Sequence, residues 1–126
     1  MKDLSNEFVV HKKKNGIEYL QFRKLLEYSD IITHAYSLGI DKNFRTARAN
    51  KEKLPKEELE KALENYEVLG RNVDIELKDM AKPNQNHTDN VQIINKKVLT
   101  DKPDFNLDEY NKTDGLITSK PGIALG

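Results

Sequence analysis

Hydrophobic and polar residues alternate most clearly between positions 8 and 22, where the pattern predicts a β-hairpin. Two strand-like runs rich in valine, isoleucine and aromatic residues flank the dipeptide Asn15-Gly16. Asn-Gly is the strongest short hairpin signal, because both central residues of a type I′ turn need a positive φ. A two-residue loop places Lys13 opposite Glu18, a favourable cross-strand pair of charges. Apolar residues fall on both faces, so we expect part of the hairpin to be covered on both sides.

The next segments have weaker patterns. Residues 23–28 predict a short helical turn, and the run of β-branched and aromatic residues over 31–38 predicts a strand that ends at Gly39. Residues 40–54 carry mixed charges and little periodicity. We interpret them as a loop or an irregular, partly helical connection.

The clearest helix in the sequence begins at Pro55. Proline is favoured in a first helical turn, where its missing N–H leaves no hydrogen bond unmade. Gly70 is a plausible end of the helix, although the apolar pattern continues for one more turn. Apolar residues recur at three- and four-residue spacing and form one stripe: Leu59, Leu63, Tyr66, Leu69 and Val73.

The last third of the chain predicts short strands between turns. Strand-like runs cover residues 91–94 and 116–118, and turn signals occur at Asp114-Gly115 and Pro121-Gly122. Strands thus alternate irregularly with one strong helix. The fold class is therefore α+β, with mixed and antiparallel sheets, an N-terminal hairpin and one long amphipathic helix.

Composition narrows the functional classes. The 126 residues fit one domain at most, and 21 Lys+Arg balance 21 Asp+Glu, so the chain lacks the basic surplus of a general nucleic-acid binder. No apolar run approaches the roughly 18 residues that a membrane helix needs, and the first ten residues lack the apolar core of a secretory signal. We therefore expect a cytoplasmic protein without membrane or nucleic-acid partners. The absence of cysteine excludes disulfides and zinc-thiolate sites within this sequence.

Three histidines are candidates for chemistry. His11 lies beside a lysine run and is expected at the surface, while His34 lies in an apolar run and is expected to be a buried, neutral, hydrogen-bonded imidazole. His87 lies in a polar, asparagine-rich turn, the kind of place where loops present functional groups. A zinc site needs three or four converging ligands, so His87 alone cannot hold one. Arg45 and Arg48 are three residues apart and could bind an anion such as phosphate, although exposed charge is the commoner role.

The order of several short segments resembles the N-terminal portion of the YfiH-like, or laccase-domain, family, whose members include proteins named polyphenol oxidase, peptidoglycan editing factor and purine nucleoside phosphorylase. The family's Q-x-H-x-x-x-V, D-G-L-I-T and P-G-x-A-L segments all occur in order. Together with an early histidine-containing segment and a helix that carries Glu64-Asn65, they span most of residues 31–126. The matching segments are Thr33–Ser37, Gln85–Val91, Asp114–Thr118 and Pro121–Leu125.

The resemblance implies a metal site. In the family, one ion, usually taken as zinc, is held by the histidine of Q-x-H, by a cysteine in an A-D-C segment and by a histidine in an H-x-G-W-R-G segment. Here the first of these is His87, and the other two segments do not occur before Gly126. The resemblance thus implies that residues 1–126 are the N-terminal part of a single domain and hold an incomplete zinc site. We expect the chain to be inactive alone.

The implied functions differ in class. A zinc-dependent purine nucleoside enzyme would cleave the glycosidic bond of a purine nucleoside with phosphate, or would deaminate adenosine with water. The same site could instead hydrolyse an amide during editing of peptidoglycan precursors. A multicopper laccase needs several histidine-rich sites, which three scattered histidines do not support. A non-enzymatic binding module is a further alternative, and apolar surface near the C-terminal end would favour self-association.

The resemblance also suggests residues for substrate or phosphate. Ser37 matches the serine of the family's early H-x-(F/Y)-S segment. The family follows this serine with T-R and a glycine pair, whereas this chain has Leu38-Gly39-Ile40. The arginine of that segment is therefore either lost or replaced by Arg45 or Arg48.

Overall fold

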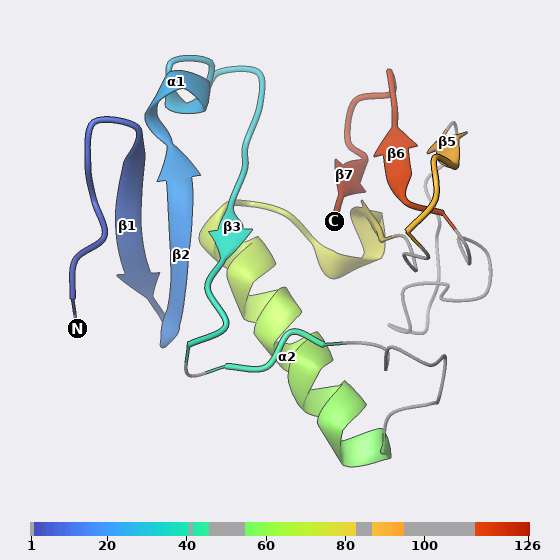
Figure 1. Ribbon diagram of the computed structural model, residues 1–126, viewed down its shortest axis with the longest axis horizontal. Helices are drawn as coiled ribbons and strands as arrows, with labels where there is room; N and C mark the ends of the chain where they lie inside the picture. Colours follow the sequence, from blue (N-terminus) through green and yellow to red (C-terminus); the bar gives the residue numbers. More distant parts are fainter. Residues whose placement is uncertain (1, 41, 46–54, 83–86, 95–112) are drawn as a thin grey trace. The chain divides into compact units, whose positions relative to one another are not determined.

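The computed structural model describes residues 2–40, 42–45, 55–82, 87–94 and 113–126. These residues belong to two compact units, Met1–Asp74 and Ile75–Gly126, each of which is described by itself. The first unit combines an antiparallel sheet with one long helix, and the second contains short paired strands (Figure 1). The predicted α+β class, with its N-terminal hairpin and mixed sheets, is confirmed.

The sheet of the first unit has three antiparallel strands. Strand β1 (Val9–Lys14) pairs with β2 (Ile17–Phe22), and β2 pairs with the short β3 (Tyr36–Ser37). Strand β2 is therefore central. Its residues 17, 18, 19 and 21 are all buried, so both faces of the strand are covered, as the sequence predicts.

The turn of the hairpin sets the predicted register. Asn15 and Gly16 have φ values of 53° and 77°, the left-handed conformation that a type I′ turn requires. Lys13 accordingly lies opposite Glu18. The two-residue turn thus fixes which side chains of β1 and β2 share a face.

The predicted helical turn after the hairpin is confirmed as α1 (Arg23–Leu26). The strand predicted over 31–38 is wrong in length, because only Tyr36 and Ser37 pair with β2. Just before them, the side chain of His34 occupies the position where backbone pairing would continue. Its Nε2 accepts the Phe22 N–H at 2.6 Å.

Helix α2 (Lys56–Asn72) begins directly after Pro55 as predicted, and it contacts β2 (Figure 1). It continues through Gly70 instead of ending there, which confirms the extra turn indicated by the apolar stripe. Burial along that stripe is uneven: Leu69 and Val73 are buried, whereas its earlier members are half-buried. The core of the first unit consists of Ile17, Tyr19, Ala62, Leu69 and Val73.

The second unit contains two parallel strand pairs. Its elements are the 3₁₀ helix η1 (Leu77–Asp79) and the strands β4 (Met80–Ala81), β5 (Val91–Ile93), β6 (Gly115–Ile117) and β7 (Ala124–Leu125). Strand β4 pairs with β7, and β5 pairs with β6. Buried Ala81 and Ile94 form its core with the half-buried Leu116 and Ile123.

Two turn predictions in this unit have different outcomes. Pro121-Gly122 is a turn, with Gly122 at a φ of 80°. The prediction for Asp114-Gly115 is wrong, because Gly115 is the first residue of β6. An extended glycine is explained here by close packing: a Cβ on Gly115 would lie 3.2 Å from Cγ2 of Val91 on the neighbouring strand.

Several predicted features lie outside the described residues. They include Arg48, Gln85 and most of the connection over 40–54. Within the part of the chain that the structure describes, no helix has the length and apolar character needed to cross a membrane.

Candidate functional site

The backbone of His87 has an unusual conformation. Its φ is 58°, one of three positive values among the described non-glycine residues. Such left-handed residues are uncommon, and histidine, asparagine and aspartate are the side chains that occur there most often. His87 therefore belongs to a local turn whose backbone must be held by its neighbours.

Asp114 holds this turn. Its carboxylate accepts the His87 N–H at 2.7 Å and the Thr88 N–H at 2.6 Å, and the Thr88 hydroxyl donates to the same carboxylate. Three donors from two adjacent residues thus converge on one side chain. Charge-assisted bonds of this kind are among the stronger hydrogen bonds in proteins. The aspartate of D-G-L-I-T therefore fixes the histidine segment.

Backbone pairing continues the contact between these two segments. The N–H groups of Asp114 and Gly115 donate to the Asn90 carbonyl at 2.9 and 3.2 Å. Strands β5 and β6 then run parallel, with Val91 opposite Gly115 (Figure 1). Since Gly115 lacks a side chain, its backbone can approach Val91 closely. The two sequence segments form one local structure.

The imidazole of His87 lies at the surface of this structure. His87 is exposed, and its hydrogen bond to Asp114 uses its backbone rather than its ring. An exposed neutral imidazole can donate a ring nitrogen to a metal ion. Within the described ranges, no group of three or more His, Cys, Asp or Glu side chains is placed to hold such an ion. The described residues therefore fit one ligand of a metal site and not a complete set.

Ser37 and Arg45 belong to the first unit. Ser37 is a half-buried residue of β3, paired with Tyr19 of β2. Arg45 is exposed, and its backbone N–H donates to Oδ1 of Asn43 at 2.9 Å.

The segment before Arg45 is held on helix α2. The side-chain amide of Asn65 donates to the Asn43 carbonyl at 2.9 Å, and the rings of Phe44 and Tyr66 meet edge to face with centroids 5.1 Å apart. Burial raises the pKa of Tyr66. These contacts place Arg45 next to helix α2. This helix carries Glu64-Asn65, which is part of the family resemblance.

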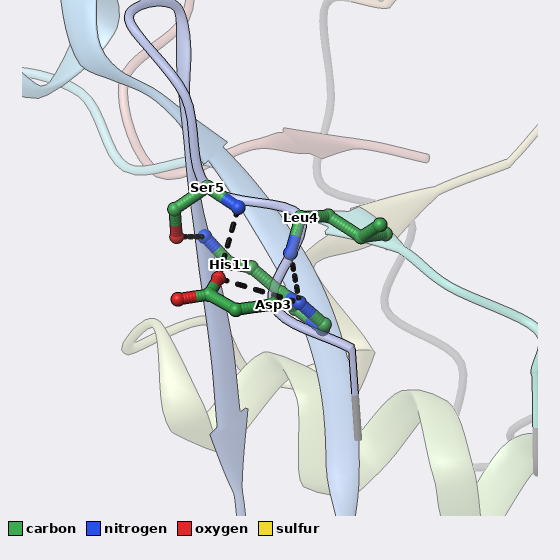
Figure 2. A network of polar contacts seen from close by, with 4 residues as sticks. All are labelled: Asp3, Leu4, Ser5 and His11. Atoms are coloured by element: carbon green, nitrogen blue, oxygen red, sulfur yellow. Dashed lines mark hydrogen bonds and ion pairs between the residues drawn. The ribbon is translucent and has the colours of Figure 1, made fainter.

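His11 differs from its predicted surface position. It is buried, because the N-terminal segment folds back along β1 and covers it (Figure 2). Its Nδ1 accepts the Leu4 N–H at 3.0 Å, and its own N–H donates to the Ser5 hydroxyl at 2.9 Å. The Ser5 N–H in turn bonds the Asp3 carboxylate and is the largest cause of a lowered pKa for Asp3. His11 thus has a role in holding the N-terminal segment.

His34 has a structural role as well. Its ring stacks on Phe22 with centroids 5.9 Å apart, and its Nε2 accepts the Phe22 N–H. The acceptor role agrees with the predicted neutral, hydrogen-bonded imidazole, although the residue is only half-buried. Desolvation, and secondarily the charge of Lys12, lowers the pKa of His34. Each of these two histidines uses a ring nitrogen to hold a backbone amide.

Residues 41–126 match the model of a protein family described as multi-copper polyphenol oxidoreductase laccase. The chain belongs to this laccase-domain family. The match covers about two thirds of the 126 residues and includes Arg45, His87 and Asp114, whereas Ser37 precedes it. Comparison with curated proteins gave no match, and comparison with solved structures gave none.

Both partners of the His87–Asp114 contact lie in the part of the chain that matches the laccase-domain family. The contact joins two of the segments on which the resemblance rests. His87 was predicted from its polar loop and from the Q-x-H segment, whereas Asp114 was interpreted only as part of a turn. No local signal identified the role of Asp114, because the turn whose N–H groups it accepts lies 27 positions away in the chain.

Proposed function

We propose that His87 is one ligand of a zinc site in a purine nucleoside enzyme of the laccase-domain family. The observation that carries this proposal is the way His87 is held. The Asp114 carboxylate binds the backbone of the His87 turn, while the imidazole remains exposed. A ligand on a backbone fixed in this way loses little conformational entropy when a metal binds.

The roles of the three histidines favour a single ion over a multicopper centre. His11 and His34 each hold a backbone amide with a ring nitrogen. His87 is thus the histidine whose ring is best placed to serve a metal. Zinc with an open coordination position would supply a water of lowered pKa.

The family resemblance implies a cysteine and a second histidine as the remaining ligands of the proposed site. In this proposal the enzyme takes a purine nucleoside, with phosphate for cleavage of the glycosidic bond or with water for deamination of adenosine. Ser37 and the exposed Arg45 are the proposed contacts for substrate or phosphate. The cytoplasm is the proposed location.

The test is a pair of variants in the intact natural protein, one at position 87 and one at position 89. His87→Asn removes the imidazole but keeps a side chain that tolerates the left-handed conformation. Asp89→Asn, at an exposed position in the same loop, is the control. Zinc and copper are measured in the purified proteins by mass spectrometry, and phosphorolysis and deamination of adenosine are assayed.

We expect His87→Asn to lose most of the bound zinc and the activity on nucleosides, while Asp89→Asn retains both. Zinc content unaffected by His87→Asn would overturn the ligand role. Copper in place of zinc would overturn the zinc assignment. Release of an amino acid from a peptidoglycan precursor without activity on adenosine would overturn the nucleoside assignment.

A further inference from the structure

A second candidate binding region lies entirely within the first unit. A cavity of about 530 Å³ is bounded by the hairpin, the segment after α1 and the end of α2. This volume is in the range of pockets that bind small organic molecules. Its polar lining includes Lys12, Lys14, Tyr19, Gln21, His34 and Asn72.

The end of α2 is bonded to the hairpin beside this cavity. The Asn72 side chain donates to the Lys14 carbonyl at 2.8 Å and accepts from the Asn15 side chain at 2.8 Å. The Thr33 hydroxyl donates to the Val73 carbonyl at 2.8 Å and so joins the segment after α1 to the end of α2. The walls are thus joined by specific hydrogen bonds, so the cavity is a built feature of the unit.

The cavity is positively charged. Lys12 and Lys14, which share one face of β1, line it together with one acidic residue, Asp74. The charge of Lys12 reaches the cavity wall, since it contributes to the lowered pKa of His34. A concave surface with this excess of positive charge attracts anions.

Gln21 provides a buried hydrogen-bond acceptor. The residue is only 6% exposed, and its Nε2 donates to the His34 carbonyl at 2.9 Å, which fixes the orientation of the amide. Its Oε1 is buried and has no hydrogen-bond partner among the described residues. A buried acceptor without a donor costs free energy, so a ligand that supplies the donor gains affinity.

We propose that this cavity binds a small organic anion that also carries a hydroxyl group. The anionic group lies at Lys12 and Lys14, and the hydroxyl donates to Oε1 of Gln21. The apolar lining from Leu26, Ile32 and Val73 accommodates the carbon skeleton. The cavity lining does not include the proposed metal ligand His87, and the test of the cavity does not depend on metal or on nucleoside activity.

Calorimetric titration of the 126-residue chain at low ionic strength tests the proposal. The probes are glycerol 3-phosphate, glycerate, inorganic phosphate and glycerol, so that the type of anion and the need for a hydroxyl are separated without changing the protein. The variant is Lys12→Gln/Lys14→Gln. The matched control is Lys24→Gln/Lys61→Gln, which removes the same charge from two exposed lysines outside the cavity lining.

We expect one of the two hydroxylated anions to bind more tightly than inorganic phosphate and than glycerol. The Lys12→Gln/Lys14→Gln variant should bind this anion about tenfold or more weakly than the original chain does. The control variant should bind it with the same affinity as the original chain. Equal affinity for inorganic phosphate and glycerol 3-phosphate, with no binding of glycerate, would overturn the role of Gln21. No binding of either hydroxylated anion, or equal loss in both variants, would overturn the proposal.

Discussion

Asp114 accepts the backbone N–H of His87 at 2.7 Å, although 27 positions separate the two residues in the chain. This contact links the histidine turn to the start of β6. It explains how a histidine can keep a left-handed backbone in an exposed loop, since the carboxylate supplies the acceptor for two consecutive N–H groups. The conformation of the candidate ligand is thus set from a distant part of the sequence.

The first prediction concerns this contact. Asp114→Ala removes an acceptor of three hydrogen bonds, and we expect it to lower the free energy of unfolding of the second unit by on the order of 1 kcal/mol. Amide hydrogen exchange at His87 and Thr88 should accelerate as well. Asp89→Ala, at an exposed position nearby, is the control. Unchanged exchange at His87 in Asp114→Ala would show that the turn is held by other contacts.

The second prediction concerns the hairpin turn. Gly16 has a φ of 77° and no atom within 4 Å of the place a Cβ would occupy. The cost of Gly16→Ala is therefore conformational alone, and we expect a loss of about 1 kcal/mol in stability measured by urea denaturation. Gly39→Ala, where φ is not positive and the nearest atom is 3.7 Å away, should have little effect. Equal losses in the two variants would contradict the role of the left-handed turn.

The third prediction is a pH dependence caused by His34. Desolvation first, and then the charge of Lys12, lowers its pKa in the folded chain below the value of about 6.5 that a free histidine has. As the pH falls through that unfolded value, the unfolded chain takes up a proton that the folded chain does not, so stability decreases. At higher pH both forms are neutral and the effect vanishes. Urea denaturation between about pH 5 and pH 8 should show this decrease, and His34→Gln should reduce it.

A titration followed by NMR checks the cause of this shift. Lys12→Gln removes one of the two contributions, so it should raise the pKa of His34. Lys24→Gln, at an exposed position, should leave it unchanged. If the pKa of His34 responded equally to both substitutions, the effect would be one of net charge and not of the neighbouring lysine.

The fourth prediction concerns the N-terminal segment held by His11. Because Nδ1 of His11 accepts the Leu4 N–H, His11→Leu should speed hydrogen exchange at Leu4 and expose residues 2–6 to proteases. His11→Asn places an amide oxygen where Nδ1 stood and should preserve more of the protection. Equal protection at Leu4 in the original chain and in His11→Leu would contradict the role assigned to His11.

The metal identity and the substrate are tested separately at His87, and the cavity of the first unit is tested through Lys12 and Lys14. These experiments read different quantities, namely metal content and anion affinity. A failure of one therefore leaves the other interpretable.

Local patterns in the sequence determined the elements whose partners are close in the chain. The turn at Asn15-Gly16 specifies its own backbone, and a two-residue loop leaves one register for β1 and β2. Helix α2 was predictable for the same reason, since its hydrogen bonds are internal and its apolar stripe is periodic. The family was visible in the sequence too, because its segments occur in a fixed order.

Only the tertiary structure decided the features that depend on distant partners. Three such features are the parallel pairing of β5 with β6, the burial of His11 under the N-terminal segment and the late start, after His34, of the strand predicted over 31–38. Each requires a contact that no local pattern encodes. The candidate site likewise depends partly on local sequence and partly on tertiary contacts. The sequence indicated His87, but the role of Asp114 emerged only from the fold, because a hydrogen bond depends on the distance and direction between groups rather than on their order along the chain.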